Sequence, residues 1–334
     1  MEKEIHLSHG SGGEDYRELV QEVFLPAYGS RELKELGDSA LCAIDRQARI
    51  ALTTDGFVVQ PLFFPGGDIG SLCVSGTVND LAVAGAVPRY LSVSMILEAG
   101  LPVDTLRRIS ESIARTARQA GVAVVTGDTK VVEHGKGDGI YVVTSGVGTL
   151  DGGWELPPQR VSPGDVLILT GPMASHGMSI LAAREGLAFS PVPQSDARPI
   201  NHLLASALEG GATVHAMRDP TRGGVGATLC EWAREDVSLI VRETAIPILP
   251  DIAAISQLLG MDPLFSANEG VAVIAAPRDQ ADDLLSRLRA HPDGREAAVI
   301  GEVTAGHGEV YCETELGTRR RLLLPRGELL PRIC

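Results

Sequence analysis

The chain of 334 residues has a formal net charge of −14, 4% aromatic residues, and five cysteines without CxxC spacing. This length favours about two domains, while the acidic charge and the few aromatic rings argue against a nucleic-acid partner. The sequence shows no apolar run of the roughly 20 residues that cross a bilayer, no signal-peptide pattern and no disulfide or zinc pattern, so we expect a cytoplasmic protein with free thiols.

The first half of the chain predicts an alternation of strands and helices. After the glycine-rich segment HGSGG, a helical pattern runs over 14–23. The helix predicted at 104–120 has one apolar face and ends before Gly121, a suitable C-terminal cap. The other predicted elements are a helix at 68–84, capped by Asp68, and strands at 48–54, 90–97, 122–126 and 140–149.

A concentration of glycine and proline at 151–164 predicts the domain boundary. We therefore expect an N-terminal domain at 1–155, a C-terminal domain at 156–315 and a flexible tail at 316–334. The second half again mixes both element types, which predicts a mixed α/β (α+β) fold for both domains. Its predicted elements are strands at 166–170, 237–242, 271–276 and 297–303, helices at 176–185, 201–208, 250–259 and 278–290, and a helix that ends near 235 after a glycine-rich turn.

Recurring aspartates are the first sign of a functional site. Asp55 and Asp128 each close an apolar strand, and strand ends are where α/β folds build sites. On a helix, Asp80 lies about 20° from Ile69, so it would be drawn inward and would need a partner such as a metal ion. A single aspartate is better explained as a helix cap or a strand stop. Together five of them favour Mg²⁺, which would let an acidic protein hold ATP: Asp38, Asp55, Asp80, Asp128 and Asp219.

Two glycine-rich segments could surround phosphate oxygens with backbone N–H groups. They are HGSGG at 9–13 and TRGG at 221–224, and neither fits a P-loop or a Rossmann pattern. A plain turn explains each of them as well. Arg222 is either a phosphate contact or an ordinary surface arginine.

A lysine, a glutamate and two histidines are further candidates. Lys130, two residues after Asp128, is either catalytic or balances charge. Glu269 precedes an apolar strand and is either a general base or a loop acid in water. His9 and His176 lie beside glycines and either line the pocket or are ordinary loop histidines, and no histidine spacing predicts a zinc or iron site.

Cys334 is the last residue and cannot serve to pack a core in the way that the other cysteines can. Pro325 and Pro331 break any regular element before it. We expect an extended arm that carries a mobile thiol. A chance cysteine at the end of a tail is the simpler alternative.

Motifs along the whole chain resemble the HypE family of hydrogenase-maturation factors, which are carbamoyl dehydratases. The wider relatives are similar to aminoimidazole ribonucleotide synthetase (PurM), selenophosphate synthetase and thiamine monophosphate kinase, which share the aspartate pattern but lack the C-terminal cysteine. The motifs that carry the resemblance are HGSGG, LTTDGFVV, GTVNDLAVAGAVP, VTGDTKVV, RDPTRGGV, SANEG and the terminal PRIC.

The resemblance implies a two-domain PurM-like fold whose N-terminal sheet forms the interface of a homodimer. It implies Mg²⁺ ligands at the five aspartates named above. It also implies an ATP site that comprises Gly10, Ser11, Gly12, Gly13, Asp38, Asn79, Asp128, Thr129, His176, Thr221, Arg222 and Gly223.

The resemblance further implies a reaction on Cys334. A carbamoyltransferase, HypF, would load a carbamoyl group on this thiol, and ATP would phosphorylate the carboxamide oxygen so that phosphate can leave. Glu269 and Lys130 would handle the protons, and Cys334 would end as a thiocyanate. The cyano group would pass to iron on the HypC–HypD complex and become a cyanide ligand of [NiFe]-hydrogenase.

Two rival functions are compatible with the same motifs. An ATP-dependent kinase or synthetase of the same superfamily would act on a free small molecule, and the loss of Cys334 would not affect it. A non-catalytic carrier would present Cys334 to partners and would not hydrolyse ATP.

Overall fold

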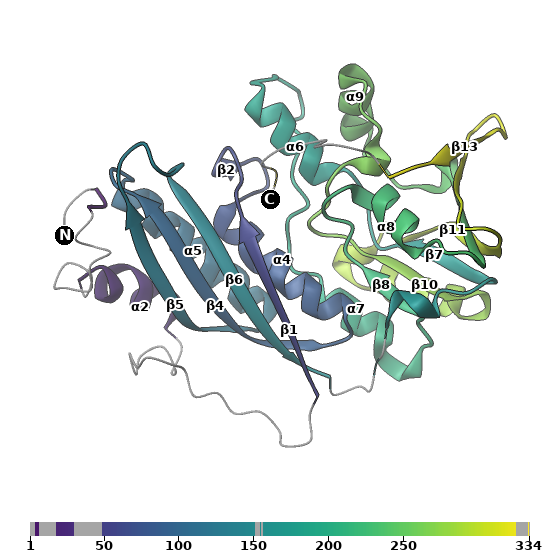
Figure 1. Ribbon diagram of the computed structural model, residues 1–334, viewed down its shortest axis with the longest axis horizontal. Helices are drawn as coiled ribbons and strands as arrows, with labels where there is room; N and C mark the ends of the chain where they lie inside the picture. Colours follow the sequence, from purple (N-terminus) through teal and green to yellow (C-terminus); the bar gives the residue numbers. More distant parts are fainter. Residues whose placement is uncertain are drawn as a thin grey trace.

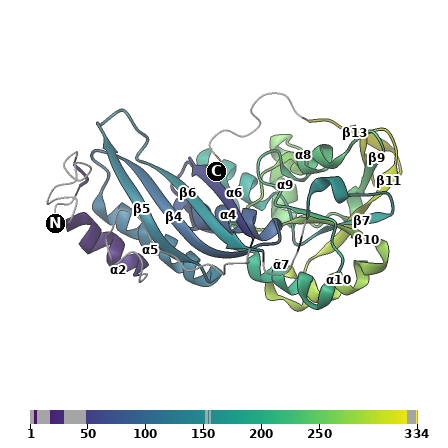
Figure 2. The same ribbon diagram turned by 60° about the horizontal axis from the view of Figure 1, so that its bottom comes forward.

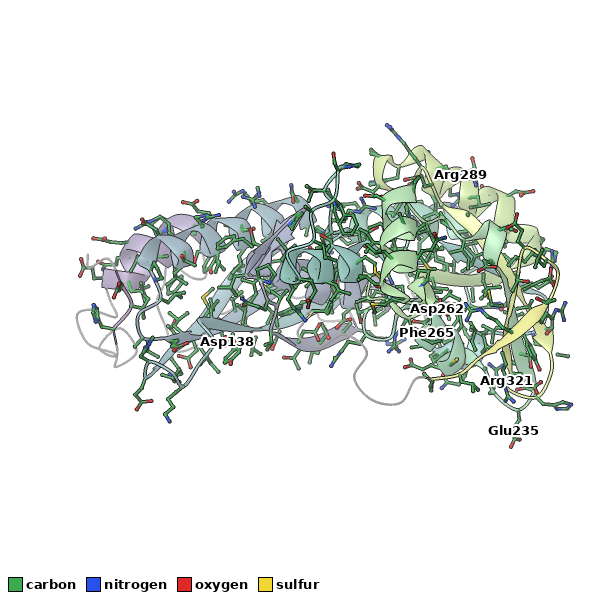
Figure 3. The ribbon with its side chains drawn as sticks, turned by 90° about the horizontal axis from the view of Figure 1, so that it is seen from above. Asp138, Glu235, Asp262, Phe265, Arg289 and Arg321 are labelled. Atoms are coloured by element: carbon green, nitrogen blue, oxygen red, sulfur yellow. The ribbon has the colours of Figure 1, made fainter. Side chains whose placement is uncertain are left out.

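A computed structural model describes residues 4–6, 18–29, 49–150, 154, 156–324 and 333. Figure 1 shows two domains, each built on one large sheet, which confirms the expected two-domain mixed α/β fold. Seen from above, Asp138 lies in the N-terminal domain, and Glu235 and Arg321 lie toward the far end of the C-terminal domain (Figure 3). Within these described ranges, no helix has both the length and the apolar character that a membrane span requires.

The N-terminal domain is built on a four-stranded sheet of order β1-β6-β4-β5. The neighbours β4 and β5 are parallel, and the other pairs are antiparallel. Helices α4 and α5 cover one face of this sheet (Figure 1). The elements are β1 (Ile50–Phe57), β4 (Val87–Glu98), β5 (Ala123–Val132), β6 (Ile140–Thr149), α4 (Ile69–Val83) and α5 (Val103–Ala120).

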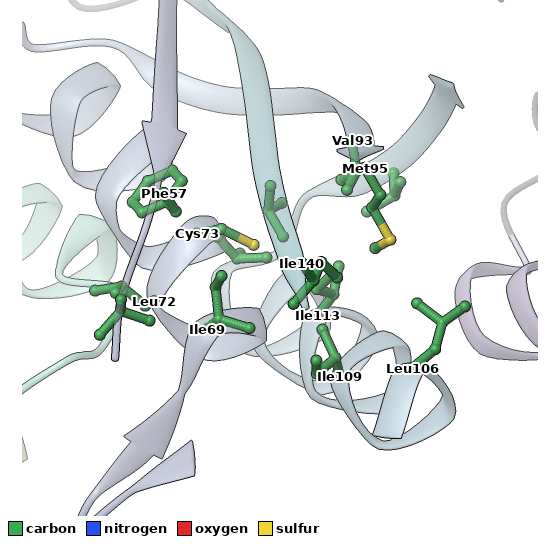
Figure 4. Packing of buried hydrophobic residues seen from close by; sticks show 14 of the residues in the cluster. Phe57, Ile69, Leu72, Cys73, Val93, Met95, Leu106, Ile109, Ile113 and Ile140 are labelled. Carbon is green, nitrogen blue, oxygen red and sulfur yellow. The ribbon is translucent and has the colours of Figure 1, made fainter. Parts of the chain in front are cut away.

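Helix α5 has the apolar face that its sequence predicts. Leu106, Ile109 and Ile113 are fully buried in the core of the domain. Figure 4 shows Ile109 and Ile113 close to Ile140 of β6. The helix ends at Gly121, whose φ of 71° is a left-handed conformation that glycine adopts readily.

Helix α4 lies in the middle of the molecule, against the sheet on one side and the C-terminal domain on the other. Its predicted cap is confirmed, since the Asp68 carboxylate accepts hydrogen bonds from Gly70 N at 2.8 Å and Ser71 N at 2.9 Å. Every residue of the helix is buried except Asp80, which is half-buried. The expected inward position of Asp80 is therefore correct only in part, because this side chain reaches the edge of a cavity.

The other face of the N-terminal sheet is open. Among the described elements no helix covers it (Figures 1 and 2). Strand alternation places Leu52, Val143 and Ile96 on this face, and each is exposed, Leu52 by 70%. This open face, made of the outward residues of β1, β6, β4 and β5, is an apolar surface with a row of hydroxyl side chains beside it: Thr54, Ser145, Ser92 and Thr126.

Short elements complete the N-terminal domain. A π-helix, η2 (Val20–Phe24), continues into α2 (Leu25–Tyr28), so the helix predicted at 14–23 extends beyond its expected end. Strands β2 (Phe63–Phe64) and β3 (Gly67–Asp68) form a small hairpin before α4.

The C-terminal domain contains a seven-stranded sheet of order β13-β12-β9-β11-β7-β10-β8 with helices on both faces (Figure 2). Side chains of α7 and α10 pack on one face, and side chains of α6, α8 and α9 pack on the other. All of β7 is buried for this reason. The elements are β7 (Asp165–Leu169), α6 (Ser175–Arg184), α7 (Asn201–Leu208), β8 (Ala216–Arg218), α8 (Gly224–Trp232), β9 (Val237–Arg242), α9 (Pro250–Leu259), β10 (Val273–Pro277), α10 (Ala281–Ala290), β11 (Ala298–Ala305), β12 (Val310–Glu313) and β13 (Arg319–Leu322).

The structure departs from the sequence expectations at sheet edges. Strands β8, β12 and β13 carry short or charged sequences without an apolar alternation, so no pattern predicts them. Strand β13 pairs with β12, so residues 319–322 of the expected tail lie in the sheet. Asp55 and Asp128 do not close their strands, because β1 continues to the buried Phe57 and β5 continues to Val132.

Candidate active site at the domain junction

A cavity of about 320 Å³ lies between the two domains. Strand β1 and helix α4 supply one wall, and the segment after β8 together with one buried glutamate supplies the other. The lining residues are Asp55, Gly56, Phe57, Gly76, Asp80, Val83, Arg218, Asp219, Thr221, Arg222 and Glu269.

The alternation of β1 turns its odd-numbered side chains toward α4. The Thr53 hydroxyl donates a hydrogen bond to Asp80 Oδ2 at 2.6 Å, which joins strand and helix beside the cavity. Gly76 allows their close approach, because a Cβ atom there would lie 3.0 Å from the Phe57 ring and 3.7 Å from Glu269 Oε2. Asp55, on the same side of the strand, lies next to Asp80 in the lining of the cavity.

The TRGG segment forms the turn that begins α8. Gly223 has a φ of 79° and Gly224 a φ of 63°, both in the region that glycine favours. A Cβ atom on Gly224 would lie 2.5 Å from Ser266 O, in the segment around Phe265 (Figure 3). Close packing and backbone conformation thus explain both glycines, and of the TRGG residues only Thr221 and Arg222 line the cavity.

The cavity concentrates negative charge. Burial, and then the neighbouring Asp80, raises the pKa of Asp55 from 3.8 to about 6. Burial, and then Asp80, likewise raises the pKa of Asp219 to about 7. Burial followed by repulsion from Asp219 raises the pKa of Glu269 well above its ordinary value. Arg222 opposes the shift at Asp55, but the carboxylates outnumber the cations, so the site is suited to a cation.

Glu269 is held in place through its backbone. Its N–H donates to Asp196 Oδ2 at 3.2 Å, and its carbonyl oxygen accepts from Asn79 Nδ2 at 3.1 Å. The same Asn79 amide donates to Arg198 O and accepts from Ile200 N, so it links α4 to two loops of the C-terminal domain. The side chain of Asn79, an expected ATP contact, thus forms its hydrogen bonds with backbone groups of the C-terminal domain.

Asp196 contacts the backbone beside Glu269, and no sequence pattern predicts this contact. Asp196 is half-buried, and desolvation raises the pKa of its carboxyl group. Its Oδ2 also accepts from Gly270 N at 2.9 Å, and a Cβ atom on Gly270 would lie 1.9 Å from Asp196 O. A lone aspartate in a loop sequence gives no signal of such a role.

His176 is buried away from the cavity lining, although the resemblance implies an ATP contact. Its Nδ1 lies 2.8 Å from Ser195 Oγ, and its Nε2 lies 2.9 Å from the carbonyl oxygen of Ile333. The residue therefore contacts the end of the chain.

Asp128, Thr129 and Lys130 lie on β5, at the opposite edge of the sheet from β1. The side chains of Asp128 and Lys130 are on the open face, where they form an ion pair of 3.0 Å and are 56% and 65% exposed. Thr129 points to the other face and is buried. Within one chain the sheet separates Asp128 and Lys130 from the cavity, and Lys130 balances the charge of its neighbour.

Some expected site residues lie outside the part of the chain that the structure describes. They are Gly10, Ser11, Gly12, Gly13, Asp38 and Cys334. In the part that is described, no three His, Cys, Asp or Glu side chains stand close enough to form a ready coordination shell.

Comparisons with known proteins agree with this architecture. The family model "AIR synthase related protein, N-terminal domain" matches residues 36–150, and the corresponding C-terminal domain model matches residues 162–313. Carbamoyl dehydratase HypE of Azotobacter vinelandii is 47% identical over 332 residues, which is 99% of this chain and 97% of that protein. The fold and the carboxylate cavity therefore define a two-domain protein of the AIR synthase related class.

Solved structures narrow the class further. The crystal structure of hydrogenase maturation protein HypE in complex with ATP has a TM-score of 0.94 and 40% identity, covering 98% of this chain and 99% of that one. The structure of a HypE–HypF complex has a TM-score of 0.81 and 40% identity, covering 92% and 99%. The chain belongs to the HypE family of carbamoyl dehydratases.

Proposed function

We propose that this protein dehydrates a carbamoyl group, carried as a thiocarboxamide on Cys334, to a thiocyanate in an ATP-dependent reaction of [NiFe]-hydrogenase maturation. The observation that carries the proposal is the place of Ile333. This residue is buried beside His176, whose neighbour Ser195 directly precedes the aspartate that holds Glu269. The chain therefore brings the residue next to Cys334 close to the loop that positions the proposed base.

The chemistry requires a good leaving group and a base. The thiocarboxamide oxygen attacks the γ-phosphorus of ATP, which releases ADP, and the nitrogen loses one proton to give an iminophosphate. Removal of the remaining N–H proton then expels phosphate and leaves the C≡N bond of the thiocyanate. Glu269 is our candidate for this second proton, because it is buried and lies at the cavity.

The charge of the cavity supports a nucleotide that arrives with Mg²⁺. Asp55, Asp80 and Asp219 would hold the ion, and Asp38 would complete the set implied by the resemblance. Bound Mg²⁺ would neutralise phosphate charge, and it would reduce the repulsion from neighbouring carboxylates that adds to burial in raising the pKa of Glu269. Thr221 and Arg222 would donate to phosphate oxygens. The HypE structure solved in complex with ATP supports the nucleotide part of this proposal.

The proposed homodimer would use the open face of the N-terminal sheet. Its exposed apolar side chains, such as Leu52 and Val143, would be buried between two copies. Asp128 and Lys130 lie on this same face and are cut off from the cavity of their own chain. We therefore assign their proposed roles in metal binding and proton handling to the cavity of the neighbouring copy.

Two further partners follow from the proposed reaction. A HypF carbamoyltransferase would load Cys334, which the solved HypE–HypF complex supports. The HypC–HypD iron complex would accept the cyano group. Both steps need the end of the chain to leave the domain junction and return.

Mass spectrometry of the intact protein tests the proposal. After incubation with HypF, carbamoyl phosphate and ATP, the mass of the protein should rise by one carbamoyl group. The mass of the carbamoylated protein should then fall by one water, and this loss should occur only when ATP is present. Cys334→Ala should abolish both changes, while Cys230→Ala, a half-buried cysteine near β13, should not. ATP-dependent turnover of a free small molecule by Cys334→Ala would favour the kinase or synthetase alternative instead.

A further inference from the structure

His176 is fully buried at the start of α6, and both of its ring nitrogens are engaged. A carbonyl oxygen only accepts, so Nε2 must carry the proton that it donates to Ile333 O at 2.9 Å. Burial lowers the pKa of His176 and favours the neutral ring, so Nδ1 accepts from Ser195 Oγ at 2.8 Å. Ser195 Oγ in turn accepts from Ala197 N at 3.0 Å. This chain of hydrogen bonds selects the tautomer that can hold Ile333.

The side chain of Ile333 makes a second attachment. It is 4% exposed and belongs to the hydrophobic core of the N-terminal domain, together with Phe57 and Phe64. The Phe64 ring also meets the His176 ring edge-on, with centroids 5.6 Å apart and an interplanar angle of 81°. An apolar anchor and a buried hydrogen bond thus hold the same residue.

The position of His176 is set by the segment that leads to Glu269. Ala174 precedes α6 with a φ of 71°, which is uncommon for a residue other than glycine. Its N–H donates to Asn268 Oδ1 at 2.6 Å, and Gly177 N donates to Ala267 O at 3.0 Å. The beginning of α6 is therefore fixed against the two residues that precede the proposed base.

Asp196 joins the two sites from the other side. It directly follows Ser195, which binds the His176 ring, and it accepts from the backbone N–H of Glu269. Asp196 is also the charged group whose field acts on His176. The same five-residue loop, 193–197, lies against the N-terminal domain, since Ser195 N donates to Pro65 O at 2.9 Å.

We propose that His176 is a positioning residue that latches the end of the chain, together with the pocket for Ile333, and so sets where the Cys334 thiol stands relative to Glu269. The latch consists of the hydrogen bond from His176 to Ile333 and the burial of the Ile333 side chain, and it acts while Ile333 occupies its pocket. The consequence for dehydration rests on the proposed function of Cys334. Release of the latch is required before a transferase can reach the thiol.

Alkylation of Cys334 tests the latch without any enzyme activity. The full-length protein, without nucleotide, is treated with iodoacetamide, and the modified peptide is followed by mass spectrometry. His176→Leu should raise the alkylation rate at Cys334 about tenfold, because one buried hydrogen bond is lost. His176→Gln should restore most of the protection, since its amide N–H replaces Nε2–H. Ser206→Ala, which removes a hydroxyl bonded within α7, is the control and should not change the rate.

Ile333→Ala provides a second test that does not disturb α6. It should also speed alkylation about tenfold by loss of the apolar anchor. In single-turnover dehydration of carbamoylated protein, His176→Leu should be slower by a similar factor, while loading by the transferase is not reduced. Wild-type alkylation rates in both His176→Leu and Ile333→Ala would overturn the latch, and so would slower dehydration without faster alkylation.

The failure of the proposed function would give a different result. Suppose that Cys334→Ala still dehydrates a free carbamoyl compound, while His176→Leu speeds the alkylation of Cys334. The latch would then be supported, and the reaction tethered to Cys334 would be wrong.

Discussion

Asp55 and Asp128 have similar sequence contexts, TTDG and TGDT, and both lie within strands of one sheet, yet their surroundings are opposite. Asp55 faces α4 and the carboxylate cavity, where burial raises its pKa to about 6. Asp128 faces the open side, where Lys130 pairs with it. Side chains alternate between the two faces of a sheet along each strand. The face to which an aspartate points therefore decides, more than its motif does, which site it can serve in a single chain.

Mixing subunits of two variants tests most directly whether Asp55 and Asp128 serve one site from different copies. Asp55→Asn and Asp128→Asn should each lower ATP-dependent dehydration by roughly 10²- to 10³-fold, because each removes charge that stabilises the transferred phosphate. If the two aspartates serve one site from different copies, mixing the two inactive variants should recover activity, since each mixed dimer contains one intact site. Measured activity that stays at the level of the separate variants would show that the two residues do not share a site across a dimer.

The pH dependence of stability tests the charge repulsion and burial of the carboxylates in the cavity. The pKa of Asp219 is raised from 3.8 to about 7 in the folded protein, so the folded state binds more protons than the unfolded state between these values. The free energy of unfolding, measured by urea titration without Mg²⁺, should therefore fall as the pH rises from about 4 to about 7. Asp219→Asn should remove roughly 4 kcal/mol of this fall, because a shift of one pKa unit corresponds to about 1.4 kcal/mol.

The open face can be tested through the oligomeric state. Leu52→Glu should weaken the proposed dimer by about tenfold or more, because burying a leucine contributes about 1.5–3 kcal/mol. Leu258→Glu is a matched control, since Leu258 is 68% exposed on α9 and Leu52 is 70% exposed on β1. Analytical ultracentrifugation that finds equal effects for the two variants would rule out the open face as the interface.

The smallest expected effect concerns the packing beneath Glu269. Gly76→Ala should lower stability by about 1 kcal/mol, because the new methyl group would meet the Phe57 ring at 3.0 Å. A methyl group on Gly56 meets nothing within 4 Å, so Gly56→Ala serves as the comparison. Thermal unfolding midpoints measure both, and a larger loss for Gly56→Ala would contradict this view of the strand–helix contact.

Much of the architecture was accessible from local patterns. The apolar face of α5 is predicted by a 3.6-residue period, and its end is predicted by Gly121. The cap at Asp68 follows from residue chemistry. The strands at the sheet edges were not predicted. For example, β13 has the sequence RRRL, and among the described strands it pairs with β12 alone. Strand pairing there depends on a neighbour that no local pattern contains.

The sequence by itself determined the two mixed α/β domains, the cap and apolar face of their helices, and the acidic residue types that favour a metal-bound nucleotide. Only the tertiary structure decided which of those residues meet. Asp196 and the contact between His176 and Ile333 join segments far apart in the chain, and the side of the sheet that each aspartate faces depends on where α4 packs. Local propensity acts over a few residues, whereas such meetings are fixed by the packing of the whole core.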